Sequence, residues 1–388
     1  MPVNIARYHT GMIDTMTLAI GLATMLYMLH LLSLGLAAFQ CRPLRGSTHA
    51  LSDSGVTLVR PLCGVESHSA LTLRSSFLQN LTHFEVLFCV ARESDSVVPL
   101  VHRLMAEHPS VRARLLIGED HLGQNPKLNN MAKGWREARY TTVVFTDSNL
   151  LITPDYCARI SNAFGPDVGM VSSPPIGSHA EGFWGEVECA MLNTHAARLQ
   201  YAASALGLRF AQGKTLAFQK GVHTTTLMQD LASEPAEDAA ATKLIRRMKK
   251  SVRLIGPPFQ QPLGQRSLKA VWSRHIRWAR LRRSTFPLLF SIELFAGICA
   301  PLAATTYALS EAGFTPALAL LLMPLLWYGP EYALARYAGW HFSARSLPAW
   351  MIRDMMLPAF YVAAWLSTDF VWHGHQMNGA KETRIRTT

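Results

Sequence analysis

The 388-residue sequence has few cysteines and few charged residues, and both shortages narrow the class of protein. Its six cysteines are scattered and form no C-x-x-C pair, so we expect neither a disulfide framework nor a metal–thiolate site, and a reduced, cytosolic main domain fits. The sequence also lacks H-E-x-x-H, G-x-S-x-G and P-loop motifs, so zincin, serine-hydrolase and P-loop signatures are all missing.

Charged residues make up only 16% of the chain because several long segments contain almost none. Residues 16–39 are 24 positions without Lys, Arg, Asp or Glu, which is long enough to cross a bilayer. No clear cleavage site follows, so we expect a retained anchor. Residues 285–310 and 314–330 predict two further spans. Residues 355–368 are either a re-entrant or interfacial segment, or a fourth span that extends through Asp369.

Acidic residues are absent from Lys243 to Arg283, a stretch that carries 13 Lys or Arg. Nucleic acid is one interpretation of such a stretch. We favour a juxtamembrane segment that faces anionic lipid, in part available to a diphosphate ligand, because a predicted span follows directly. Arg42, Arg45 and the arginines before the second span place the main domain in the cytosol. The basic tail after residue 380 leaves the topology of the last segment open.

Strand and helix patterns alternate through the first half of the main domain. Strand patterns lie at 56–59, 84–90, 113–117, 142–146 and 168–172, with helical patterns at 97–107 and 127–138 between them. This alternation predicts an α/β fold with a mixed, mainly parallel sheet and flanking helices. Residues 181–203 are expected to be helical, 210–218 a strand, and 266–283 a basic amphipathic helix. Ligands of such sheets bind at the carboxyl ends of the strands.

Asp147 directly follows the strand pattern 142–146. A carboxylate there can reach a divalent cation held by a nucleotide diphosphate, and Asn149, on the same side, adds a carbonyl oxygen. The alternative is a turn aspartate that caps the following loop. Asp147 alone does not decide between these two roles.

Glu237 and Asp238 open a helical pattern. Complementarity to the helix dipole explains many such acids. The functional alternative is a general base, because sugar transfer with inversion requires the acceptor hydroxyl to lose its proton as it attacks the anomeric carbon. We predict Asp238 as the base and Glu237 as its neighbour.

Arg274, Arg277 and Trp278 share one face if their stretch is helical. Arginine forks suit phosphate oxygens and stabilise charge on a departing diphosphate. Trp278 offers a flat wall for an acceptor or a lid. An interfacial helix with an aromatic belt residue is the other interpretation.

Three weaker signals lie elsewhere. Glu93 and Asp95 follow the second strand, where an acid that binds uracil or ribose is expected, although loop acids are common. Lys127 and nearby amides open a helix and can meet phosphate or sugar oxygens, although capping by Asn125 explains the same pattern. His195 is unpaired in the sequence and is more readily a structural histidine.

Together these motifs resemble those of the ceramide glucosyltransferases, in particular their bacterial relatives, which are inverting enzymes with a GT-A fold. The similarity covers residues 56–283. Residues 60–66 resemble a K-P-L-x-G-V-D motif that ends here at Glu66, and 125–130 resemble N-P-K-x-N-N. Asp147-Ser148 matches the second aspartate of the family, Glu237-Asp238 its E-D pair, and 274–278 its Q/R-x-x-R-W.

The resemblance implies a UDP-sugar donor, a divalent cation (Mg²⁺ or Mn²⁺) and a ceramide acceptor at a lipid bilayer. It implies Asp238 as the base, and His195 matches a histidine linked to the donor or inhibitor site. It implies donor contacts at Asp147 and at Glu93 or Asp95, and the full set of predicted donor-binding residues is Glu66, Glu93 or Asp95, Lys127, Asp147, His195 and Glu237. Residues 212–215, Q-G-K-T, replace a T-G-M-S-like segment near the acceptor, which leaves a hopanoid or diacylglycerol acceptor open.

We therefore expect an inverting, multi-pass glycosyltransferase of a bacterial cytoplasmic membrane that moves glucose from UDP-glucose to the primary hydroxyl of ceramide. The expected organisation is an anchor (1–45), a cytosolic catalytic domain (46–265), an interfacial helix (266–284) and a membrane region (285–388). The alternatives are another lipid, a donor with galactose or glucuronate, and a non-catalytic membrane scaffold with a degenerate fold.

Overall fold

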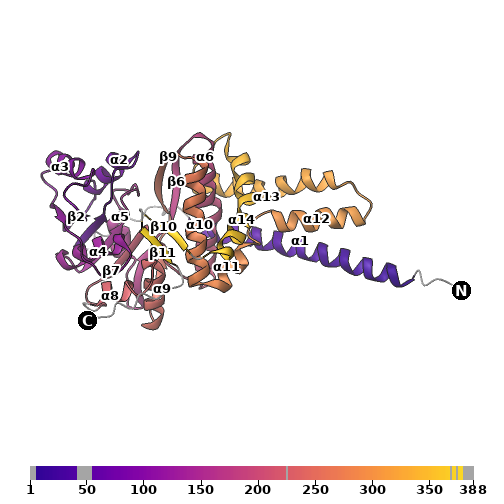
Figure 1. Ribbon diagram of the computed structural model, residues 1–388, viewed down its shortest axis with the longest axis horizontal. Helices are drawn as coiled ribbons and strands as arrows, with labels where there is room; N and C mark the ends of the chain where they lie inside the picture. Colours follow the sequence, from indigo (N-terminus) through magenta and orange to yellow (C-terminus); the bar gives the residue numbers. More distant parts are fainter. Residues whose placement is uncertain (1–5, 42–54, 224–225, 368, 373–374, 379–388) are drawn as a thin grey trace.

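The α/β body and the long apolar helices lie at opposite ends of the computed structural model, which describes residues 6–41, 55–223, 226–367, 369–372 and 375–378 (Figure 1). Helices α1 (Ala6–Gln40), α12 (Cys299–Glu311) and α13 (Pro316–Ala338) extend away from the body. Arg42, Arg45 and the tail after residue 380 lie outside the described residues, so the positive-inside argument stays a prediction.

The body is built on a seven-stranded sheet in the order β3-β2-β1-β4-β7-β5-β8. Its strands are β1 (Val56–Pro61), β2 (Phe84–Val90), β3 (Ala113–Ile117), β4 (Thr142–Thr146), β5 (Val168–Ser172), β7 (Thr215–Gln219) and β8 (Ser251–Leu254). All neighbours are parallel except β7, which is antiparallel to both β4 and β5. The predicted mixed, mainly parallel sheet is therefore confirmed, and β2 to β5 have the predicted bounds.

Helices cover both faces of the sheet because its apolar strand residues alternate between two buried clusters. On one face lie α4 (Pro126–Glu137) and α8 (Leu227–Leu231); on the other lie α3 (Val98–Glu107) and α5 (Tyr156–Asn162). Asn125 caps α4, since its Oδ1 accepts from the backbone N–H groups of Lys127 and Leu128. Short segments α2 (Ser69–Arg74) and η1 (Ser75–Phe77) follow β1, and α9 (Glu237–Arg247) precedes β8.

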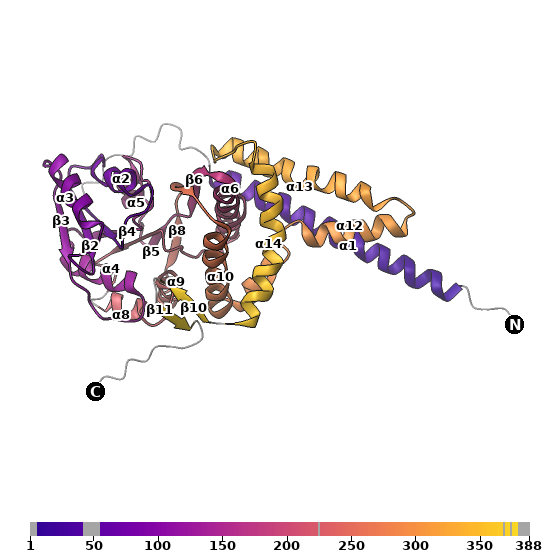
Figure 2. The same ribbon diagram turned by 45° about the horizontal axis from the view of Figure 1, so that its top comes forward.

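A second layer joins this sheet to the apolar helices. The parallel pair β6 (Pro175–Glu181) and β9 (Phe259–Gln265) leads into α6 (Gly182–Ala190) and α10 (Leu268–Thr285). Helix α6 continues through a π-helical segment, η2 (Met191–Ala197), into α7 (Arg198–Ala205), which confirms the predicted helix at 181–203. Helix α10 lies beside α14 (Ser346–Leu366), and the hairpin β10 (Asp369–Trp372)–β11 (His375–Asn378) follows (Figure 2).

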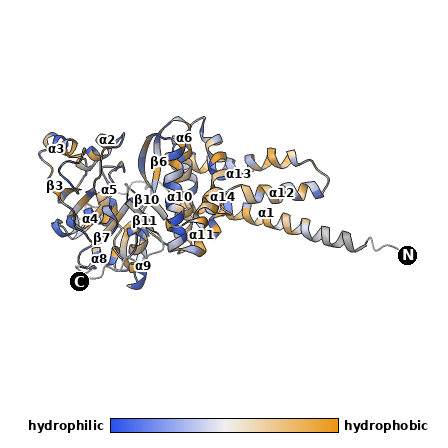
Figure 3. Ribbon diagram, viewed as in Figure 1, coloured by the Kyte–Doolittle hydropathy of each residue, from blue (hydrophilic) through white to orange (hydrophobic). Residues whose placement is uncertain are grey.

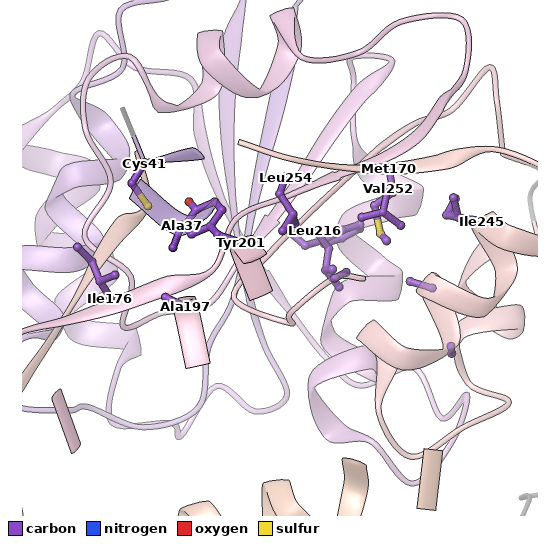
Figure 4. Packing of buried hydrophobic residues seen from close by; sticks show 14 of the residues in the cluster. Ala37, Cys41, Met170, Ile176, Ala197, Tyr201, Leu216, Ile245, Val252 and Leu254 are labelled. Carbon is purple, nitrogen blue, oxygen red and sulfur yellow. The ribbon is translucent and has the colours of Figure 1, made fainter. Parts of the chain in front are cut away.

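The C-terminal end of α1 is buried in the body. Ala37 and Cys41 are 0% and 1% exposed and belong to the same core cluster as Tyr201 of α7 (Figure 4). The Tyr201 hydroxyl donates to the carbonyl oxygen of Ile255 at 2.8 Å. The C-terminal end of α1 is therefore part of the hydrophobic core that packs against one face of the sheet.

Two helices in the described part of the chain are long and apolar enough to cross a membrane, Thr15–Gln40 and Pro316–Ala338 (Figure 3). They confirm the first and third predicted helical segments. The prediction of one helix at 285–310 is wrong, because the helical structure is interrupted between α11 (Pro287–Glu293) and α12. In the break, the Ile298 N–H donates to Asp354 Oδ2, and a β-carbon on Gly297 would lie 3.2 Å from Asp354 Cγ. Residues 355–366 are the second half of α14.

A buried ionic network joins α7, α13 and α14. The fully buried Glu331 carboxylate lies 3.4 Å from Arg198 Nη1 and 2.9 Å from Arg353 Nη1. Arg353 Nε also contacts Asp354 Oδ1 at 2.8 Å. His30 of α1 lies 2.7 Å from Arg198 Nη1, so the first apolar helix is part of the same network.

We expect Glu331→Gln to lower the thermal unfolding midpoint of the detergent-solubilised protein, because two buried arginines would lose their shared counter-charge. Breaking a buried pair in this way costs about 3–5 kcal/mol. Glu311→Gln, at the exposed end of α12, is the matched control. Equal midpoints for the two variants would contradict a structural role for the network.

Candidate active site

Lys127 lies at the centre of the cluster of predicted site residues. Its Nζ is 2.7 Å from Asp147 Oδ1, 2.6 Å from Glu237 Oε1 and 2.6 Å from the carbonyl oxygen of Gly213. Lys127 is in the first turn of α4, Asp147 follows β4, and Glu237 begins α9. Burial lowers the pKa of Lys127, but the two carboxylates outweigh it and hold that pKa above its usual value. The ammonium group therefore stays charged.

A second lysine neutralises the other oxygen of Asp147. Lys214 Nζ lies 2.9 Å from Asp147 Oδ2. Burial raises the pKa of Asp147, but Lys127 and Lys214 outweigh it and hold that pKa well below its usual range. Asp147 is thus a permanent anion between two cations.

Asn149 and Glu66 extend the cluster outwards. The Lys214 ammonium donates to Asn149 Oδ1 at 2.8 Å, and Asn149 Nδ2 donates to Glu66 Oε1 at 3.2 Å. Glu66 in turn lies 3.9 Å from Arg266. The sequence predicted Glu66 and Asn149 as site residues, and the structure connects Asn149 to Asp147 through Lys214, and Glu66 to Asn149.

The donor set around Asp147 does not fit a divalent cation. The two side chains predicted to hold it, Asp147 and Asn149, both turn an oxygen to the Lys214 ammonium group, and Lys127 covers the remaining Asp147 oxygen. Among the described residues, no group of three or more His, Cys, Asp or Glu side chains is arranged to hold a metal ion. A cation at this position would have to displace Lys214.

Asp238 is held differently from Asp147, because backbone amides rather than lysines contact its carboxylate. Its Oδ2 accepts from the Gly213 N–H and its Oδ1 from the Ala239 N–H, both at 2.8 Å. Burial and the neighbouring charge of Glu237 raise the pKa of Asp238 to about 6. A carboxylate with a pKa near neutrality suits a general base. Glu237 is buried and accepts from Asn125 Nδ2 at 2.7 Å.

The R-x-x-R-W residues lie on α10, and their contacts differ from one another. Arg274 pairs with Glu188 of α6, a fully buried carboxylate that also faces Arg266 Nε at 3.1 Å. Burial and Arg274 lower the pKa of Arg277 to about 10. Trp278 packs against a buried cluster of Cys189, Leu192 and Leu263. Arg266 lies close to both Glu188 and Glu66, and so connects these residues to the Asp147 cluster.

Glu93 and Asp95, the two acids that follow β2, lie apart from the cluster around Lys127. The Asp95 carboxylate accepts from the backbone N–H of Gly64 at 3.0 Å and of Val97 at 2.9 Å, so it joins the loops after β1 and β2. Glu93 is exposed, and its side chain makes no hydrogen bond or ion pair among the described residues. Neither acid contacts Lys127 or Asp147 within the described part of the chain.

His195 is not brought into the cluster. It is buried in η2, and burial together with the charges of Arg353 and Arg198 holds its pKa well below 6.5. Its Nδ1 has no hydrogen-bond partner among the described residues. The contacts described for this chain connect His195 to the helical layer rather than to Asp147 or Asp238. A direct role in donor binding stays a prediction.

The sequence reasoning assigned no site role to four residues that support the cluster. Lys214 and Gly213 contact the predicted carboxylates, Glu188 holds Arg274, and the buried Arg60 donates to the carbonyl oxygen of Asp147 at 2.6 Å. The departure of residues 212–215 from the T-G-M-S-like pattern was the one available signal for Lys214. Glu188 lies inside a helical stretch and gives no signal in the sequence.

Comparison with known proteins identifies the family. The model of glycosyl transferase family 21 matches residues 25–385. Ceramide glucosyltransferase 1 of Caenorhabditis elegans is 24% identical over 342 residues, which cover 86% of this chain and 73% of the relative. Ceramide glucosyltransferase of Komagataella phaffii is 36% identical over 113 residues, 28% of this chain and 22% of the relative.

A solved structure shows the same fold. The mannosyltransferase of Pyrobaculum calidifontis, in complex with GDP-mannose and Mn²⁺, matches with a TM-score of 0.52 at 21% identity. The match covers 91% of this chain and 98% of that enzyme. The glycosyltransferase fold expected from the sequence is thereby confirmed.

We expect Gly213→Ala to lower the thermal unfolding midpoint. An added β-carbon would lie 2.8 Å from Glu237 Oε1 and 3.1 Å from Lys127 Nζ, so it would force the two charges apart. Such overpacking costs about 1–3 kcal/mol. Gly221→Ala is the control, because a β-carbon there meets nothing within 4 Å. A midpoint for Gly213→Ala equal to that of the control would show that the cluster relaxes freely.

Proposed function

Since the chain belongs to glycosyl transferase family 21, we propose that this glycosyltransferase moves glucose from UDP-glucose to the primary hydroxyl group of ceramide, with inversion at the anomeric carbon. The observation that carries the proposal is the family match over residues 25–385, which includes the α/β body and the apolar helices on both sides of it. The two relatives described above are named ceramide glucosyltransferases and support the same acceptor.

Asp238 acts as the base in this proposal. Its carboxylate takes the proton of the acceptor hydroxyl while the hydroxyl oxygen forms a bond to the anomeric carbon. The bond from that carbon to the diphosphate oxygen breaks on the opposite face, and UDP leaves with the electron pair. The raised pKa of Asp238 supports this role, since an ordinary carboxylate is a weaker base.

Lys127, Lys214 and Arg277 stabilise the negative charge that develops on UDP as it leaves. Lys127 and Lys214 place two ammonium groups at the carboxyl end of β4, where sheets of this kind bind ligands. Arg277 is one further candidate, because a guanidinium fork matches two phosphate oxygens. Arg274, which is paired with Glu188, keeps this face of α10 against α6 and positions Trp278 for the acceptor.

The predicted divalent cation fits poorly with the oxygen donors of Asp147 and Asn149. The Mn²⁺ in the solved mannosyltransferase is consistent with a cation in this fold. In this chain the oxygens of Asp147 and Asn149 already contact Lys214, so every step proposed here uses the chain's own groups.

The membrane position follows from the acceptor. Ceramide keeps two apolar chains in the bilayer, and the apolar helices α1 and α13 would hold the α/β body at the bilayer surface. We propose a multi-pass protein of a cytoplasmic membrane with its catalytic domain in the cytosol, an interfacial α10 and the domain limits expected from the sequence.

The direct test is sugar transfer by the purified, detergent-solubilised protein. We expect glucosylceramide from UDP-glucose and ceramide, and a loss of about 10²–10⁴-fold in kcat for Asp238→Asn, because the base is removed. The product is measured by mass spectrometry. Product from diacylglycerol or a hopanoid but not from ceramide would support glycosyl transfer to a lipid and exclude ceramide as the acceptor. UDP binding without transfer to any lipid or from any UDP-hexose would favour the scaffold alternative.

The pH profile tests the base separately. Protonated Asp238 cannot accept a proton, so kcat/KM should fall as the pH drops through about 6, the raised pKa of this carboxyl group. The rate should be independent of pH just above that value. An acidic limb near pH 4, where an ordinary aspartate titrates, would exclude Asp238 as the base.

A further inference from the structure

Lys214 occupies the position between the two oxygen donors that the sequence predicts for a divalent cation. Its Nζ lies 2.9 Å from Asp147 Oδ2 and 2.8 Å from Asn149 Oδ1. One ammonium group therefore bridges both side chains at ordinary hydrogen-bond distances.

The register of the sheet fixes this position. Thr146 of β4 is paired with Thr215 of β7, and one residue beyond that pair the Asp147 N–H donates to the Lys214 carbonyl oxygen at 3.2 Å. The two side chains are thus neighbours across two adjacent strands. The Lys214 side chain is only 15% exposed, so it is not a surface lysine that swings freely in water.

The two lysines and the two carboxylates that they contact carry equal and opposite charges. Lys127 and Lys214 supply two positive charges, and Asp147 and Glu237 supply two negative ones, all connected by contacts of 2.6 to 2.9 Å. A divalent cation placed between Asp147 and Asn149 would meet two ammonium groups at short range. A diphosphate bound at this edge of the sheet would meet these two ammonium groups in place of a divalent cation.

We propose that Lys214 takes the place of the divalent cation, so that this enzyme binds the diphosphate of its donor, and transfers the sugar, without a divalent metal. The inference rests on the proposed sugar-nucleotide donor and concerns the same site. Lys214 is a donor-binding residue in it, and Asp147 and Asn149 orient the lysine rather than a metal ion.

The test is UDP binding by the full-length, detergent-solubilised protein, measured by isothermal titration calorimetry in EDTA and in Mn²⁺. We expect the Kd of the wild type to differ by less than about threefold between the two conditions, because Lys214 supplies the charge in both. In EDTA, Lys214→Met should weaken binding by about tenfold or more, since it removes a charge-assisted contact. Mn²⁺ should restore the affinity of this variant, because Asp147 and Asn149 are then vacant.

Lys220→Met is the matched control. Lys220 directly follows the other end of β7, and its Nζ donates to the carbonyl oxygen of Ala138, away from the cluster. This variant should bind UDP like the wild type in both conditions. Electron paramagnetic resonance of Mn²⁺ gives a second readout: in the presence of UDP, Lys214→Met should immobilise Mn²⁺ and the wild type should leave it free.

Three results would overturn the inference. The first is UDP binding by the wild type that disappears in EDTA, a comparison that needs no variant to fold. The second is a folded Lys214→Met that binds UDP in EDTA as tightly as the wild type. The third is absence of UDP binding in every condition, which would also remove the proposed donor. Metal-independent UDP binding without sugar transfer to any lipid would support the diphosphate site inferred here and contradict the proposed transfer reaction.

Discussion

The contact of the Lys127 ammonium group with Asp147, Glu237 and the Gly213 carbonyl oxygen holds the site together. It joins the start of α4, the end of β4, the start of α9 and the loop before β7. Without a cation at this point, Asp147 and Glu237 would lose the counter-charge that they share. The same contact leaves Asp238 outside the ion pairs, where burial makes it more basic.

A second ionic cluster, around Glu331, connects the helix that contains Glu188 to the apolar helices. Arg198 continues the helix that contains Glu188, and it contacts both Glu331 and His30. The α/β body is therefore linked by buried charges and by the packed end of α1 to the helices that we place in the bilayer. For a water-soluble donor and a lipid acceptor, such a link would keep the base at a constant depth relative to the membrane surface.

The sequence predicted most of the sheet, because β2 to β5 are apolar runs bounded by polar turns. It failed where a distant residue decides the local structure. The run at 285–310 is apolar enough for one helix, but it is interrupted between α11 and α12, where the Ile298 N–H donates to Asp354 of α14. The strand expected at 210–218 begins only at Thr215, and just before it the Gly213 N–H donates to the Asp238 carboxylate of α9 rather than to a neighbouring strand.

Composition, strand patterns and the order of the motifs determined the fold class, the apolar first helix and the prediction of Asp147, Glu237 and Asp238 as site residues, since these depend on neighbours in the chain. Only the tertiary structure decided how the charges are shared. Which lysine faces which carboxylate depends on the register of β4 and β7 and on the distance between helix ends. Such distances bring together residues far apart in the sequence, so the contacts of Lys214 with Asp147 and Asn149 could not be predicted from its own segment.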